Sequence, residues 1–243
     1  MSELRDVLAV IPARYASTRL PGKPLALLHG RPLVLHARDA ALAAGIARVV
    51  VAADDERIVA AVRAAGGEAQ MTSPAHASGT DRVAEVAARS PAGVVLNLQC
   101  DEPEADPALL RELCESIAGG EAMATAAARL EDPAHLECPH VVKVVCDAAG
   151  HALYFSRARI PAAHPGAAGA PPAYGHLGIY AFGRETLERF VRLEPSRLER
   201  LEGLEQLRAL ENGIRIRVLR AARFTRGVDT PEDLEELERR IRP

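Results

Sequence analysis

Short apolar runs alternate with amphipathic stretches along the first half of the chain. Four runs have the composition and length of strands, the last of them apolar enough for the middle of a parallel sheet: VLAVI (7–11), RVVVAA (48–53), EAQM (68–71) and GVVLNLQ (93–99). The stretches between and after them have helical periodicity and helix-start or helix-stop residues: 32–45, 54–67, 78–90 and 106–120. This alternation predicts an α/β fold, a mostly parallel sheet with helices on both faces.

The alternation stops in the second half. Residues 141–147, 151–157 and 176–183 are strand-like without helices between them, and DAAG (147–150) has the composition of a hairpin turn. We therefore expect one domain over residues 1–243 with a small antiparallel subdomain at about 130–183. It contains a Pro/Gly/Ala-rich loop at 161–175, too poor in large side chains to pack, and the sequence does not reveal whether this loop is mobile. A long helix over 195–213, a strand over 214–219 and a helix starting at Thr230–Pro231 complete the prediction.

Composition narrows the class of protein. Of 243 residues, 48% are apolar and 26% charged, enough for a sizeable core under a polar surface. The net charge of −3 argues against a nucleic-acid partner, and no apolar run has the length of a membrane span. The polar start MSELRD lacks a signal-peptide pattern, and four cysteines without a C-x-x-C pair indicate reduced thiols. We expect a cytoplasmic protein.

Three polar segments follow predicted strands: residues 12–24, 72–80 and 99–104. Open parallel sheets bind ligands beyond the C-terminal ends of their strands. We therefore expect these segments to converge in space.

The first of them, IPARYASTRLPGKPL (11–25), is rich in cations. Arg14, Arg19 and Lys23 suit phosphate oxygens, while prolines and Gly22 keep the segment out of helical geometry and leave N–H groups free. A solvated surface loop is the alternative, and the position at a strand end favours phosphate. The chain lacks a P-loop motif and a G-x-G-x-x-G motif, which argues against a dinucleotide enzyme.

Two carboxylates lie where a metal ion would help such a site. Asp101 follows the central strand, and Asp229 precedes the Thr230 cap without being needed for it. Asp side chains suit Mg²⁺, which binds one or two carboxylates together with phosphate oxygens and water. The alternative for Asp101 is a structural role in its turn.

Taken together, the motifs resemble a known family. They occur in one order over most of the chain: IPARYASTRLPGKPL, HASGTDR, NLQCDEP, VKVV, YFSRARIP, HLGIYAF, LEQLR and GVDTPEDL. This set is similar to the 3-deoxy-manno-octulosonate (Kdo) cytidylyltransferases, also called CMP-Kdo synthetases. The resemblance implies a Rossmann-like nucleotidyltransferase fold. It also implies transfer of CMP from CTP to the 2-hydroxyl of Kdo, with release of pyrophosphate, for lipopolysaccharide biosynthesis.

The resemblance also assigns residues. The CTP site would comprise Pro12, Ala13, Arg14, Ser17, Arg19, Lys23, Thr72, Ser78 and Gln99. Asp101 and Asp229 would bind Mg²⁺ and act in catalysis with Arg14, Arg19 and Lys23. The sugar site would comprise Arg157, His176, Tyr180, Glu205 and Gln206. The family further implies a homodimer built on the subdomain, although its apolar strands fit an internal core equally well.

Some positions depart from the family pattern, and other functions remain open. Cys100 stands where Gly is more frequent, so it would be strained if φ were positive there and otherwise exposes a thiol to oxidation beside the metal site. His140 replaces a frequent Asn, and Gly175 replaces a usual Arg, which leaves open whether Kdo or its 8-amino form is the substrate. The alternatives are a CMP-sialic acid synthetase, a catalytically silent nucleotide-binding regulator, and a glycosyltransferase, which the missing D-x-D motif disfavours.

Overall fold

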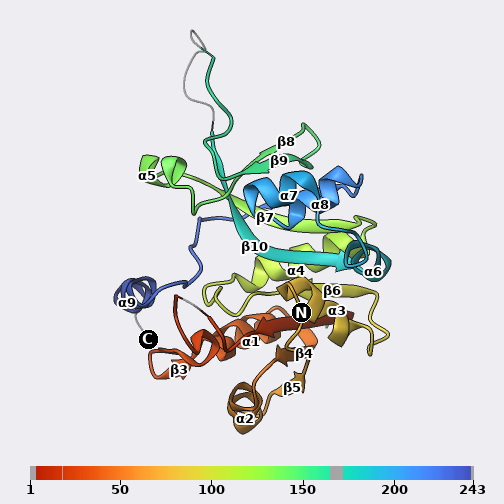
Figure 1. Cartoon of the computed structure of the whole chain (residues 1–243), viewed down its shortest axis with the longest axis vertical. Helices are drawn as coiled ribbons and strands as arrows, with labels where there is room; N and C mark the ends of the chain where they lie inside the picture. Colours follow the sequence, from red (N-terminus) through yellow and green to blue (C-terminus); the bar gives the residue numbers. More distant parts are fainter. Residues whose placement is uncertain (1–3, 18, 165–171, 242–243) are drawn as a thin grey trace.

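The computed structural model describes residues 4–17, 19–164 and 172–241, and its main sheet lies between two layers of helices (Figure 1). Within these residues the sheet has nine strands, seven of them in the order β11-β7-β10-β6-β1-β4-β5. The strands of this path, in chain order, are β1 (Leu4–Ala13), β4 (Ile46–Ala53), β5 (Glu68–Met71), β6 (Val94–Asn97), β7 (Met123–Arg129), β10 (Tyr174–Gly183) and β11 (Ile216–Arg220). The apolar run that became β6 lies in the middle, as predicted.

Helices cover both faces of the sheet, because alternate strand residues point to opposite sides and both sides are apolar. One core packs the odd-numbered side chains of β1, such as Ile11, against α1 (Leu33–Ala43), α2 (Glu56–Ala64) and α4 (Pro107–Ala118). The other packs Leu8 and Val10 on the opposite side. Its helices are α3 (Gly79–Ala87), α6 (Arg184–Phe190) and α8 (Gln206–Glu211). The α/β fold with helices on both faces is confirmed.

Strand β10 has a special place in the described part of this seven-strand path, because it runs antiparallel to both neighbours while the other six share one direction. Its second half pairs with β6, with Tyr180 opposite Asn97. Its first half, from Tyr174 to Leu177, continues past the last residue of β6 and pairs with β7. Strand β10 therefore carries side chains beyond the edge where β1, β4, β5 and β6 end.

The predicted antiparallel segment is a hairpin attached to this strand. β8 (Lys143–Cys146) and β9 (Ala152–Ser156) pair with each other, and β8 also pairs with β10. Gly150 lies in the turn with φ of 83°, a conformation that glycine adopts without strain. Whether residues 130–183 form a separate sugar-binding or dimerisation unit stays a prediction. The 161–175 loop lies in part outside the described residues.

The long helix predicted over 195–213 is wrong. The segment forms α7 (Arg197–Glu202) and α8, which are separated because Gly203 has φ of 63° and ends the first helix in the left-handed conformation. The regular spacing of Glu and Arg along the segment concealed this break. The prediction also missed the strand β7 and the short helices α5 (Pro133–Glu137) and α6.

The last helix, α9 (Pro231–Arg240), starts with Thr230 as its cap and Asp233 completing a capping box, as the sequence predicts. It packs at the end of the molecule that holds the short 3₁₀ helix η1 (Lys23–Leu25) and the small sheet of β2 (Leu27–Leu28) and β3 (Arg31–Pro32) (Figure 1). Val228 and Leu237 bury against Leu28 and Leu33 there. The packing brings Asp229 next to the first polar segment.

Candidate active site

A cavity of about 270 Å³ lies where the parallel strands end. The three predicted polar segments and the start of α9 line it together: Pro12, Arg14, Ser17, Arg19, Lys23, His76, Ala77, Ser78, Gly79, Arg82, Gln99, Cys100, Asp101 and Asp229. We call this cavity the rim cavity. The predicted convergence of distant segments at this edge of the sheet is confirmed.

The cationic segment folds around Tyr15. Its backbone carbonyl accepts hydrogen bonds from Ser17 N at 2.9 Å and Gly22 N at 3.1 Å, and its own N–H donates to Asp54 at 2.9 Å. Gly22 has φ of 70°, and a Cβ there would lie 3.3 Å from the Tyr15 ring, so the turn needs glycine. The turn ends at η1, whose first residue, Lys23, points into the cavity.

Lys23 joins the two predicted metal ligands. Its Nζ donates to Asp101 Oδ2 at 2.6 Å and to Asp229 Oδ1 at 2.9 Å, so the two carboxylate oxygens lie within about 5.5 Å of each other. Burial alone would lower the pKa of Lys23, but the two carboxylates outweigh it and raise that pKa above its ordinary value. The site therefore holds a fixed positive charge between two negative ones.

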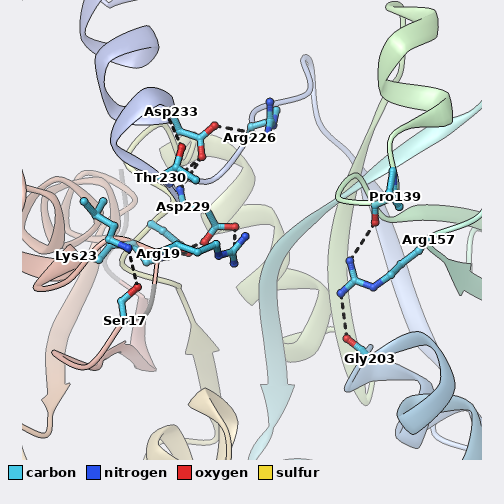
Figure 2. Close-up of polar contacts among 12 residues, drawn as sticks. Ser17, Arg19, Lys23, Pro139, Arg157, Gly203, Arg226, Asp229, Thr230 and Asp233 are labelled. Atoms are coloured by element: carbon cyan, nitrogen blue, oxygen red, sulfur yellow. Dashed lines mark hydrogen bonds and ion pairs between the residues drawn. The ribbon is translucent and has the colours of Figure 1, made fainter.

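Arg19 lies on the other side of Asp229, with Nη2 at 3.1 Å from Oδ2, and Figure 2 shows the two side chains directed toward each other. The described residues contain no group of three or more His, Cys, Asp or Glu side chains arranged for a metal ion. Two hard carboxylates that already share one cation do fit an ion that takes its remaining ligands from phosphate and water.

Thr72 and Ala13, predicted to contact CTP, do not line the rim cavity. Thr72 is buried, and its hydroxyl donates to Ala53 O at 2.9 Å and accepts from Arg82 Nη1 at 2.5 Å. Ala13 is likewise buried, as the last residue of β1. Both remain predictions as ligand contacts.

Arg82 is a cavity residue that the sequence analysis missed. Besides Thr72 it contacts Asp54 at 3.4 Å, which holds its guanidinium at the rim although the side chain is almost fully buried. Its place in the motif HASGTDR, one helical turn after the capping residue Ser78, was the available signal. Ser78 itself lines the cavity and caps α3 by accepting from Asp81 N at 3.1 Å.

A second cavity of about 510 Å³ adjoins the first. We call it the acceptor cavity, and the two share Arg19, Gln99, Asp101 and Asp229. Its other walls come from the 140–142 segment, the first half of β10 and the 224–233 segment, including His140, His176, Phe224 and Arg226. The predicted sugar residue His176 therefore borders the same carboxylates as the cationic loop.

His176 and Tyr180 project from the same face of β10. The His176 ring lies 5.3 Å from the Tyr180 ring and 5.1 Å from the Phe155 ring, and its Nε2 is 2.9 Å from Thr125 Oγ1. Burial lowers the pKa of His176 to about 3 and raises that of Tyr180 well above 10. Both side chains are therefore neutral hydrogen-bonding groups at physiological pH.

Glu205 and Gln206 lie at the start of α8, not in the middle of a long helix. Glu205 Oε2 accepts from Thr80 Oγ1 at 2.5 Å, and Oε1 is buried without a hydrogen-bond partner among the described residues. Burial raises the pKa of Glu205, and Gln206 is buried as well. Neither residue lines the rim cavity or the acceptor cavity beside it, so their contact with the sugar stays a prediction.

Arg157 is oriented differently from the predicted sugar contact. Its guanidinium donates to three backbone carbonyls, Glu202 O at 2.6 Å, Pro139 O at 3.1 Å and Gly203 O at 3.3 Å. Figure 2 shows the guanidinium between Pro139 and Gly203, separate from the Arg19–Asp229 pair. It lines neither cavity, so a contact with the sugar stays a prediction.

The Cys100 position causes no backbone strain. Its φ is not positive, since His29 is the one non-glycine residue with positive φ in the described part of the chain. Burial raises the pKa of the Cys100 thiol to about 12, so the thiol is protonated and poorly reactive. Oxidation of this thiol beside the metal site stays a prediction.

Comparison with known proteins identifies the family. A cytidylyltransferase family model matches residues 8–216. The 3-deoxy-manno-octulosonate cytidylyltransferase of Anaeromyxobacter dehalogenans is 54% identical over 236 residues, 96% of each chain. That of Vibrio cholerae (strain M66-2) is 48% identical over 240 residues, 95% of each chain.

A solved CMP:2-keto-3-deoxy-manno-octonic acid synthetase in complex with CTP has the same fold, with a TM-score of 0.90 and 41% identity over 98% of both chains. A nucleotidyl transferase from Methanothermobacter thermautotroptrophicus shares the fold alone, at 16% identity and a TM-score of 0.61. The chain therefore belongs to the cytidylyltransferases, and within them to the 3-deoxy-manno-octulosonate cytidylyltransferase family.

Proposed function

We propose that the rim cavity binds the nucleotide and the acceptor cavity binds the sugar acid, so that the two substrates meet at the residues common to both. The reaction is the transfer of CMP from CTP to the 2-hydroxyl of Kdo, with release of pyrophosphate. The single observation that supports this arrangement is that Arg19, Gln99, Asp101 and Asp229 line both cavities.

The charges of the rim suit a triphosphate. Arg14, Arg19, Lys23 and Arg82 face a cavity that otherwise contains two carboxylates, and the acceptor Kdo is an anion as well. The repulsion between two anionic substrates must be neutralised before the 2-hydroxyl can reach the α-phosphorus. Catalysis would then consist mainly of in-line positioning and electrostatic stabilisation.

Asp101 and Asp229 would hold Mg²⁺, because they present hard oxygen donors within reach of one ion and share a cation already. When bound, the metal supplies positive charge to the triphosphate and the attacking hydroxyl. Lys23, released from one or both carboxylates, would turn its ammonium group to phosphate oxygens. The side chains at the rim contribute charge and orientation, and we assign none of them as a general base.

The sugar acid would contact neutral polar groups in and beside the acceptor cavity. His176 lines it, and Tyr180 lies against the His176 ring. Uncharged imidazole and phenol groups suit the hydroxyls of a sugar acid, because each can donate or accept a hydrogen bond.

The test is a coupled assay of pyrophosphate release from CTP, with Kdo, 8-amino-Kdo and sialic acid as acceptors. Wild-type protein is expected to turn over Kdo, and Asp101→Asn and Asp229→Asn are each expected to lower kcat about a hundredfold, the effect of about 3 kcal/mol. Asp39→Asn, at an exposed pair with Arg31, is the control and should leave kcat unchanged. Faster turnover of sialic acid, or full activity of both site variants, would contradict the proposal.

Two expectations about the assembled protein remain predictions, a homodimer and a cytoplasmic location. Among the described residues, no helix combines the length and the apolar composition that a membrane crossing requires. Light scattering of the purified chain would determine the oligomeric state.

A further inference from the structure

Phe224 is the aromatic wall of the acceptor cavity. It lines this cavity and not the rim cavity, and it lies five residues before Asp229 in the segment that connects β11 to α9. Val141 and Val142 also line the cavity, whereas Arg19, Gln99, His140 and Arg226 make much of the lining polar. Phe224 thus provides an aromatic surface in a largely polar cavity.

The ring is held in place by close packing against a glycine. A Cβ built on Gly175 would lie 2.6 Å from Phe224 Cε2 and 2.7 Å from both Phe224 Cδ2 and Leu130 Cδ2. Real Cβ atoms do not approach other atoms so closely, so a side chain at position 175 and the ring in this position exclude each other. On another side, the His135 ring lies 5.4 Å away at 59°.

We propose that Phe224, held against Gly175, determines which sugar acid the acceptor cavity accepts. The ring offers an apolar surface to the C–H face of the sugar and limits how long an acceptor the cavity can hold. An aromatic ring suits this role because it buries a large apolar area and loses little conformational freedom. The inference rests on the proposed assignment of the acceptor cavity to the sugar acid.

The close contact between Gly175 and Phe224 can be tested separately. Gly175→Ala should act on the substrate through Phe224, because the added methyl group must displace the ring. Leu130 Cδ2 is the far end of a flexible side chain and can move aside, so the ring is the contact that decides the outcome. A variant without the ring should then tolerate the methyl group.

The experiment measures kcat/KM for Kdo, kcat/KM for sialic acid, KM for CTP and Tm. The variants are Phe224→Ala, Gly175→Ala and the double variant. Tyr174→Ala is the matched control, since Tyr174 is also aromatic, precedes Gly175 and lines neither cavity, its ring lying 3.6 Å from the guanidinium of Arg220.

Phe224→Ala and Gly175→Ala are each expected to lower kcat/KM for Kdo about tenfold. Both variants should raise the ratio of kcat/KM for sialic acid to kcat/KM for Kdo. Both should keep KM for CTP within about twofold of the wild-type value. The double variant should lose no more Kdo activity than Phe224→Ala alone, and Tyr174→Ala should keep the wild-type acceptor ratio. A purely structural role would lower Tm in the single variants without moving that ratio.

The inference is overturned if Phe224→Ala leaves the acceptor ratio unchanged, or if the losses in the double variant are additive. That result differs from a failure of the proposed function. If His176→Gln raises KM for Kdo while Phe224→Ala does not, the acceptor cavity is assigned correctly and only the role of Phe224 fails. If neither variant affects Kdo, the assignment of the cavity itself fails.

Discussion

Replacing Lys23 with glutamine tests the electrostatic arrangement of the rim directly. In the structure its ammonium group lies between Asp101 and Asp229, at 2.6 and 2.9 Å. Glutamine removes the charge and keeps much of the length, so two carboxylates then face each other without a cation between them. We expect lower stability without Mg²⁺, tighter Mg²⁺ binding and slower turnover.

The magnitude follows from the distances. Two like charges about 5 Å apart repel by about 3 kcal/mol at an effective dielectric constant of about 20. The Asp229 side chain is 40% exposed and that of Asp101 25%, so solvent and salt reduce this to about 1 kcal/mol. We expect Tm without metal to fall by about 3 °C, and Mg²⁺ affinity to rise about fivefold because the ion no longer competes with the ammonium group.

The assay is thermal unfolding with a chelator and with excess Mg²⁺, together with calorimetric Mg²⁺ titration and turnover of CTP with Kdo. Turnover should fall about a hundredfold, because a charge proposed for the triphosphate is lost. Arg31→Gln is the control, since it breaks an exposed ion pair of 2.6 Å with Asp39. If Mg²⁺ raises the Tm of Lys23→Gln no more than that of wild type, the two aspartates are not the metal ligands.

Three further predictions concern stability. The Glu104 side chain is almost fully buried and pairs with Arg223, at 2.9 Å, and with Arg240 of α9. Glu104→Gln should therefore lower the free energy of unfolding by about 1 kcal/mol. It should also speed hydrogen exchange in α9, measured by mass spectrometry. Gly203→Ala places a side chain at φ of 63° and should cost about 1 kcal/mol, seen as a Tm about 3 °C lower; an unchanged Tm would contradict the helix break. His176 has its pKa lowered to about 3 in the fold, so its contribution to stability is complete above pH 6.5 and is lost as pH falls toward 3. His176→Gln should therefore flatten the decline of stability from pH 6.5 to 5 by about 2 kcal/mol, measured by urea unfolding at each pH; an equally steep decline would refute the burial of a neutral imidazole.

The parts of the fold that the sequence predicts are those whose local pattern matches their tertiary environment. EAQM became β5 with unchanged bounds, and Asp106–Pro107 starts α4 as a cap followed by proline. The strand β7, MATAAAR, escaped prediction because alanine has low strand propensity and its burial comes only from neighbours in the sheet.

The long-helix error has a different physical origin. Local propensity and charge spacing favour a continuous helix over residues 195–213, and a single glycine in such a pattern is weak evidence for a break. In the structure Leu204 and Leu207 bury in the same core cluster as Phe155 of β9 and Phe182 of β10, which requires a turn after Gly203. Tertiary packing, which the sequence does not display, decides the outcome.

Tertiary packing also separates the site predictions that the structure supports from those that it does not. Arg14, Lys23 and Asp101 were predictable because they follow strand ends, and topology alone brings such residues together. Thr72 and Arg157 depend on side-chain direction. The hydroxyl of Thr72 is engaged by Ala53 and Arg82, and the guanidinium of Arg157 by backbone carbonyls, so neither lines the rim cavity or the acceptor cavity.

The reversed strand β10 explains how a nucleotide rim acquires an acceptor site. Parallel strands alone would bring only loops to this edge, as β1 and β6 do. Because β10 runs the other way, its first residues pass beyond the last residue of β6, and the His176 side chain borders the same cavity as Asp101. A rigid strand therefore fixes the acceptor wall relative to the carboxylates. In-line transfer between two anions needs such fixed geometry, since a mobile wall would lose the entropic advantage of holding both substrates.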